Sequence, residues 1–164
     1  MPLPPDRPAS PQLGYYLGCP VWASPEWGGV IYPPSAKRGT WLSWYSKAFN
    51  SVEGNSAFYS LPSRELIARW CDETAEGFQF CFKVPREISH DARLENCEQA
   101  TMTLLDRLQL LQERHRLGPT FLQLPPTFSF AEFDALVDFI DRWPEEFPLA
   151  VEVRHADYFD AGRR

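Results

Sequence analysis

The sequence predicts an α/β fold, namely an incomplete (β/α)8 TIM-type barrel that holds about the first five β/α units with parallel strands. Short apolar segments alternate with amphipathic helical segments along the chain. The expected strands begin about every 33 residues, so eight such units need about 265 residues, close to the ~250 of a closed barrel. An open doubly wound sheet is the alternative, but no glycine-rich phosphate loop follows any expected strand.

The expected strands are apolar segments too short for helices, rich in aromatic or β-branched residues and bounded by glycine or proline. They are Tyr15–Pro20, Ser51–Phe58, Phe78–Val84, Thr120–Leu124 and Leu149–Arg154. Apolar residues at helical spacing predict helices over Lys37–Phe49, Arg64–Asp72 and Glu95–Leu117, the last ending at Gly118–Pro119. A further helix follows the capping box of Ser129 and Glu132 and ends at Pro144.

Composition sets the broad class of the protein. The 164 residues are 44% hydrophobic, 15% aromatic and 23% charged, which is typical of a folded soluble domain. Residues 1–13 contain five prolines, and we expect a flexible tail there and the barrel domain over residues 14–164. No apolar run reaches the ~20 residues of a membrane span, and the N-terminus does not resemble an export signal, so we expect a cytoplasmic protein without membrane contact.

The net charge and the spacing of the cysteines limit which binding partners and cofactors are expected. The net charge of −6 argues against broad electrostatic capture of nucleic acid, although a local basic groove is compatible with it. Cys19, Cys71, Cys81 and Cys97 form no CxxC pair and have no histidines at metal spacing. We therefore expect free thiols rather than disulfides or a zinc site, and no cofactor.

The candidate functional residues are identified from the alternation of apolar and polar side chains, which repeats every two residues in the expected strands. Aliphatic and aromatic side chains alternate with mixed polar ones, so the apolar set is expected to face the helices and the polar set the barrel interior. The polar residues gather toward the C-terminal ends of the strands, where barrel enzymes have their sites. They are Glu53, Asn55, Lys83, Gln123, Glu152 and Arg154, and His90 and His155 follow in the loops.

A structural interpretation competes with the functional one. The charged residues can form a buried network in which they neutralise one another without catalysis. Gln123 alone is typical of a structural hydrogen-bonding residue. Trp22, Trp27 and Tyr59 suit packing or pocket walls. Function is favoured because burial of about four charges costs folding free energy that apolar residues at these positions would not cost.

Several stretches resemble one known family. They are Gly18–Cys19 with Trp22 and Trp27, residues 49–63, residues 78–85 with His90, residues 117–126, and residues 150–155 with Phe159. On these residues the chain resembles the YecE-like family, domain of unknown function 72, over about residues 15 to 160. The resemblance implies a (β/α)8 barrel. Members of this family continue through three more strands, so the resemblance implies a C-terminally truncated chain with open sheet edges that invite self-association.

The hypotheses for function fall into three classes. The first is a hydrolase or isomerase-type enzyme for a small anionic substrate, with Glu53 and Glu152 as general base and acid and Lys83 and Arg154 holding phosphate or carboxylate. Lys83 is thus counted with the catalytic residues, and the expected substrate-binding residues are Trp22, Asn55, Tyr59, Gln123, Arg154, His155 and His90. A metal-dependent variant, resembling phosphoesterase barrels, uses Glu53 and Glu152 with His155 or His90 as ligands, although no metal is expected.

The second class is nucleic-acid binding, with Trp22, Trp27 and Tyr59 stacking bases, which the net charge disfavours. The third is an inactive fragment that needs a complementary chain.

Overall fold

A computed structural model of the chain describes residues 15–160, so the predicted proline-rich tail over residues 1–13 lies outside the described residues. The strands are β1 Gly18–Cys19, β2 Ser51–Gly54, β3 Gln79–Phe82, β4 Thr120–Gln123 and β5 Leu149–Glu152. The α-helices are α1 Trp41–Ala48, α2 Ser56–Tyr59, α3 Arg64–Glu73, α4 Glu98–Glu113 and α5 Phe133–Arg142. The shorter helical segments are η1 Pro25–Trp27, η2 Arg38–Thr40, η3 Glu87–Asp91, η4 Phe130–Glu132 and η5 Ala156–Phe159, of which η3 is a π-helix.

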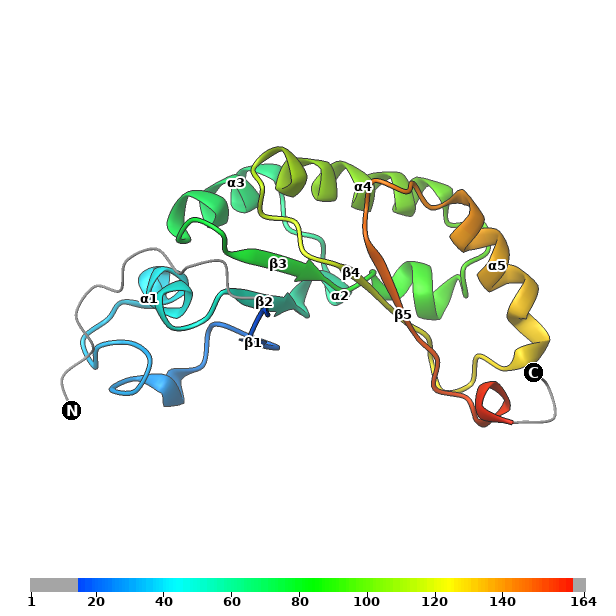
Figure 1. Cartoon of the computed structure of the whole chain (residues 1–164), viewed down its shortest axis with the longest axis horizontal. Coiled ribbons are helices and arrows are strands. Elements are labelled where there is room, and N and C mark those ends of the chain that lie inside the picture. Colours follow the sequence, from blue (N-terminus) through cyan, green and yellow to red (C-terminus); the bar gives the residue numbers. More distant parts are fainter. Residues whose placement is uncertain (1–14, 161–164) are drawn as a thin grey trace.

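The strands are parallel and lie in chain order. One sheet has the order β1-β2-β3 and the other pairs β4 with β5. Two isolated parallel bridges, Phe80 to Leu117 and Lys83 to Phe121, connect β3 to the segment that contains β4. The strands therefore form one open arc, along whose convex side α3, α4 and α5 lie (Figure 1). A doubly wound sheet reverses its strand order at a switch point, and the strands of residues 15–160 show no such reversal.

The expected division of the strands into two faces is confirmed for β2, β3 and β4. The outward side chains of these strands are buried in the main core, where 3.6-residue periodicity brings the apolar stripes of α3 and α4 against them. These outward residues are Val52, Phe80, Phe82 and Leu122. The inward side chains at positions 53, 81, 83, 121 and 123 are half-buried because no layer covers the concave face within the described residues.

At β5 the expectation of a helix-covered outer face is confirmed for Leu149 and Val153, which pack against the core, and is wrong for Val151. Val151 is 38% exposed although its neighbour across the ladder, Leu122, is fully buried. The reason is its position, since β5 is an edge strand and only the short η5 follows it in the part of the chain described. The edge of the arc thus leaves apolar surface uncovered.

Backbone conformation sets several element boundaries that the sequence pattern misplaces. The predicted helix 95–117 begins only at Glu98, because Arg93, Leu94 and Asn96 have positive φ angles of 52°, 71° and 50°. It ends at Glu113, and His115 with φ 55° turns the chain before Gly118 is reached. The capping box of Ser129 and Glu132 is confirmed.

The second strand is shorter than predicted, because residues 56–59 form the one-turn helix α2. A tight turn at Asn55, whose backbone N–H donates to the carbonyl of Glu53 at 2.9 Å, separates β2 from α2. This early turn places α2 at the C-terminal edge of the sheet instead of extending the strand.

Close approach of two strands requires glycine at position 18. A Cβ atom there would lie 2.2 Å from the carbonyl oxygen of Ser51, a backbone atom that the β1–β2 pairing holds in place. At Gly39 a Cβ atom would meet nothing within 4 Å. The two glycines therefore form a matched pair for a test of this packing.

We expect Gly18→Ala to lower the free energy of unfolding by about 1–3 kcal/mol, because the added methyl group forces β1 away from β2. Gly39→Ala should stay within about 0.5 kcal/mol of the original chain. Urea unfolding followed by circular dichroism measures both. Equal stability of the two variants would show that β1 is not held against β2 as described.

Candidate functional site

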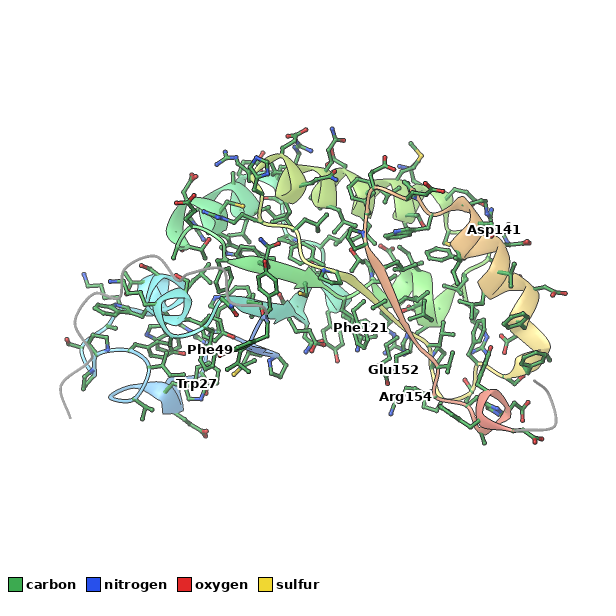
Figure 2. All side chains as sticks on the ribbon, in the orientation of Figure 1. Trp27, Phe49, Phe121, Asp141, Glu152 and Arg154 are labelled. Atoms are coloured by element: carbon green, nitrogen blue, oxygen red, sulfur yellow. The ribbon has the colours of Figure 1, made fainter. Side chains whose placement is uncertain are left out.

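Four polar side chains line up across the C-terminal ends of β3, β4 and β5, and we call Lys83, Gln123, Glu152 and Arg154 the rim row. Lys83 Nζ donates to Gln123 Oε1 at 2.8 Å. Gln123 Nε2 donates to both carboxylate oxygens of Glu152, at 2.9 and 3.0 Å. Arg154 Nε lies 3.6 Å from Glu152 Oε1. Figure 2 shows Glu152 and Arg154 at the end of β5, on the concave side of the arc.

Strand register creates the rim row. Gln123 and Glu152 are direct partners in the parallel β4–β5 ladder, so their side chains leave the same face side by side. Lys83 forms a bridge with Phe121, two residues before Gln123, and its long side chain reaches forward to the amide. The sequence prediction that these residues converge is therefore confirmed by the contacts within the row.

The contacts fix the orientation of the Gln123 amide. Its carbonyl oxygen faces the ammonium and its NH2 group faces the carboxylate, as their charges require. The amide thereby separates Lys83 from Glu152, which form no direct ion pair among the described contacts. An ammonium group has three N–H donors and only one is directed at the amide, so Lys83 retains donors for a ligand.

The β2–α2 region contributes an aromatic ring below the ammonium. Lys83 Nζ lies 4.3 Å from the centroid of the Phe58 ring, and the His90 ring meets the same ring edge-on with 5.0 Å between centroids. A cation over an aromatic face is attracted by the ring quadrupole. Phe58 is only 8% exposed, so the surrounding residues keep its ring in place. Lys83 and His90 therefore pack against the same well-positioned ring.

His90 lies in the π-helical turn η3, which directly follows β3. Its Nδ1 is 2.9 Å from Ser89 Oγ, and Ser89 is fully buried. Partial burial lowers the pKa of His90 below its usual 6.5, and the positive charges of Lys83, Arg86 and Arg154 lower it further. His90 is therefore neutral at pH 7. The cationic groups of Lys83, Arg86 and Arg154 all favour this neutral form.

The other predicted catalytic carboxylate, Glu53, is not part of the rim row. It lines a separate hollow of about 290 Å³ on the concave face, together with Cys19, Cys81 and Phe121. Burial and the negative charge of Glu53 raise the pKa of the Cys81 thiol to about 11. Within residues 15–160 the Glu53 carboxylate accepts no hydrogen bond, so it remains available to a ligand in this hollow.

Three predicted substrate-binding residues make contacts elsewhere. Trp22 packs edge-on against Trp70 of α3, with 4.9 Å between ring centroids, which matches the packing interpretation. Asn55 Nδ2 donates to the carbonyl of Pro20 at 3.4 Å. His155 Nδ1 accepts from the backbone N–H of Asp157 at 3.2 Å and caps η5. No contact in the described part of the chain joins these three residues to the rim row.

A bidentate ion pair that the sequence analysis did not predict connects the segments that follow β3 and β4. The Arg93 guanidinium donates to both carboxylate oxygens of Glu132, with Nη2 to Oε2 at 2.6 Å. These hydrogen bonds hold the pKa of the Glu132 carboxyl below its usual value. The residues are 39 positions apart, and only the capping-box role of Glu132 had a local sequence signal.

The described residues do not contain a preformed metal centre. In residues 15–160 no group of three or more His, Cys, Asp or Glu side chains is arranged to hold a metal ion. Glu53 and Glu152, the expected carboxylate ligands of the metal-dependent variant, lie in different groups. All four cysteines are free thiols. No helix in the described chain is both long and apolar enough to cross a membrane.

Residues 16–164 match the family of proteins of unknown function DUF72. The chain belongs to this family. It is 41% identical over 148 residues to the UPF0759 protein YecE of Escherichia coli strain K12, and equally to that of strain O157:H7. The matches cover 90% of this chain and 51% of each relative, so the chain spans about half the length of these curated relatives.

Solved DUF72 structures resemble the fold. A DUF72 protein of Thermotoga maritima MSB8 matches with a TM-score of 0.70 and 26% identity, over 90% of this chain and 58% of that one. A DUF72 protein of Enterococcus faecalis V583 matches with a TM-score of 0.68 and 22% identity, over 90% and 54%. The resemblance to the YecE-like family is thus confirmed, and a parallel α/β architecture is shared with known DUF72 proteins.

The lowered pKa of His90 has a consequence for stability. A histidine whose folded pKa lies below its unfolded value binds fewer protons in the folded state. Protonation therefore destabilises the fold, and the free energy of unfolding decreases as pH falls below about 6.5 toward the lower pKa of folded His90.

We expect NMR titration of the imidazole Cε1–H signals to give His90 a pKa below 6.5, and Lys83→Met to raise it because one nearby positive charge is removed. Lys47→Met is the matched control, since Lys47 lies on α1 over the Trp44 ring and should leave the His90 titration unchanged. An unchanged His90 pKa in Lys83→Met would contradict the grouping of these residues.

Proposed function

We propose that the rim row binds the phosphate or carboxylate group of a small ligand, and that DUF72 proteins of this type catalyse a hydrolytic or isomerase-type reaction there. The observation that carries the proposal is the continuous row from Lys83 through Gln123 to Glu152. The row contains a cation, Lys83, that has unused N–H donors, and an oriented carboxylate, Glu152. Both lie at the C-terminal ends of parallel strands, where ligands of such sheets bind.

The charges of the row suit an anion. Lys83 offers a point charge, whereas Arg154 offers a planar fork that matches phosphate or carboxylate geometry. The Arg154 side chain is 45% exposed and its Nε lies 3.6 Å from Glu152, so a ligand can reach it. A neutral His90 adds a hydrogen-bonding group without a further charge to be compensated.

Glu152 is the favoured acid or base of the proposed reaction. Gln123 donates to both of its oxygens and so fixes the plane of the carboxylate, which orients a proton-transferring group. Glu53 is the second proposed carboxylate and would act from the adjoining hollow on a ligand that spans both. The pair thus has one oriented carboxylate and one without protein partners, which suits different roles.

We expect inorganic phosphate to bind the chain with millimolar affinity and Lys83→Met to weaken binding at least about tenfold, since one charge-assisted hydrogen bond is lost. Isothermal titration calorimetry measures both. Lys47→Met has the same change of net charge and should bind as the original chain does. Equal loss in both variants would mean that phosphate binding depends only on net charge. An original chain that binds neither inorganic phosphate nor acetate, a simple carboxylate, would end the proposal.

We further propose that the open arc is part of a (β/α)8 barrel whose remaining units adjoin its two edges. Chain-ordered parallel strands with helices on the convex side support this, and so does a match to about half the length of the relatives. Both edges also carry exposed apolar side chains. They are Tyr15, Tyr16 and Leu17 beside β1, and Phe133, Val137, Ile140 and Val151 on α5 and β5.

In the isolated chain we propose that a second copy covers these edges. The edge strands β1 and β5 each offer unpaired backbone groups, which favour strand pairing with another chain. Charge is complementary as well, because α5 presents Asp134, Asp138 and Asp141, whereas the region of η2 and α1 presents Lys37, Arg38 and Lys47.

We expect light scattering after size exclusion to show concentration-dependent association of the purified chain. Val137→Lys combined with Ile140→Lys should reduce it, because two charges replace apolar groups that are 37% and 41% exposed. Met102→Lys changes an exposed apolar residue on α4, away from both edges, and should leave association unchanged. A strictly monomeric chain at every concentration would contradict this proposal.

A further inference from the structure

A second hollow lies at the same end of the strands as the rim row. It has a volume of about 350 Å³, and we call it the rim hollow. It is lined by residues of the loop region after β2, which contains α2, and of the loop region after β3, which contains η3. Its lining includes Phe58, Tyr59, Arg86, Glu87 and Asp91. The volume is in the range of small-molecule pockets, and both loops follow C-terminal strand ends, where ligands of parallel sheets bind.

Phe58 connects the rim hollow to the rim row. Its side chain lines the hollow, and Lys83 Nζ lies 4.3 Å from its ring centroid. The next residue, Tyr59, meets the Phe58 ring edge-on with 5.0 Å between centroids. A single ligand with two parts can therefore contact Lys83 with one part and the hollow with the other.

Tyr59 provides a flat surface at the hollow. Its side chain is 78% exposed, and its hydroxyl makes no hydrogen bond within residues 15–160. A ring of a ligand can stack on the exposed face of this aromatic side chain. The free phenol can also donate to a ligand hydroxyl.

The charge of the hollow differs from that of the row. Arg86 is paired with Asp91, with 3.2 Å between Nε and Oδ1, and the exposed Glu87 carboxylate has no ion-pair partner in the described chain. The hollow thus has an excess of negative charge and repels a second phosphate or carboxylate. Its carboxylates are acceptors that suit the hydroxyl groups of an uncharged ring.

We infer that the rim hollow accommodates the hydroxyl-bearing ring of a ligand whose single anionic group is held by the rim row, as in a sugar monophosphate or a sugar acid. This inference rests on the proposed function, because the row must bind the anion. The row selects the charged end and the hollow selects the neutral body, so the two groups together set the direction in which the ligand lies. Phosphate and carboxylate heads share this chemistry.

The test compares inorganic phosphate, glucose-6-phosphate, glucuronate and glucose by isothermal titration calorimetry. We expect one of the two sugar anions to bind at least about tenfold more tightly than inorganic phosphate, a difference worth about 1.4 kcal/mol. Which of them binds more tightly distinguishes a phosphate head from a carboxylate head. If neither sugar anion binds more tightly than inorganic phosphate, or if glucose binds as tightly as the preferred sugar anion, the inference is overturned while the proposed anion site stands.

Variants separate the hollow from the row. Tyr59→Ala should reduce the affinity for the preferred sugar anion to that of inorganic phosphate, and should leave phosphate binding unchanged. Tyr16→Ala, which removes another exposed tyrosine at the far edge, is the control and should change neither. Full affinity for the sugar anion in Tyr59→Ala contradicts the inference, whereas failure of the original chain to bind phosphate or either sugar anion overturns the proposed function as well.

Discussion

The Gln123 amide is the group on which the arrangement of the candidate site depends. Its two ends face a cation and an anion on neighbouring strands, so three side chains from β3, β4 and β5 have one mutual geometry. A direct ion pair between Lys83 and Glu152 would use both charges internally. The intervening amide instead orients both groups while it leaves ammonium donors unused.

The supporting structure explains why this geometry is held. The buried outward residues of β2, β3 and β4 attach the strands to the helical layer, and the register between β4 and β5 places Gln123 beside Glu152. Beside the row, the Arg93–Glu132 ion pair joins the loops that follow β3 and β4. The loop after β3 also carries His90, so the ion pair helps to hold the segment that contains this histidine.

Sequence reasoning predicted the strands and the convergence of Lys83, Gln123 and Glu152, because a period of two and parallel pairing determine which side chains share a face and an edge. It did not separate Glu53 from the row. The two-residue alternation shows which face of the sheet a side chain lies on, but it does not give the distance between side chains on that face when the sheet is curved. The Arg93–Glu132 pair was missed because the two residues are 39 positions apart, and because the sequence gives no signal for the left-handed backbone that Arg93 adopts.

The positions of Trp22 and Val151 show a related limit of pattern reasoning. An aromatic residue after a strand can form the wall of a pocket or pack in the core. The contact of Trp22 with Trp70 shows that Trp22 has the packing role. Exposure of Val151 depends on whether another layer covers β5, and the strand itself has the same apolar alternation as its buried neighbours. Tertiary neighbours, and not local pattern, decide both cases.

The most direct test of the central claim is the side-chain amide signal of Gln123 in nitrogen-15 NMR during titration with phosphate. If Gln123 connects the cation and the carboxylate of one anion site, its NH2 signals shift progressively to a plateau, and Glu152→Gln changes their starting position. Signals that stay unchanged while phosphate binds elsewhere on the chain would contradict the account.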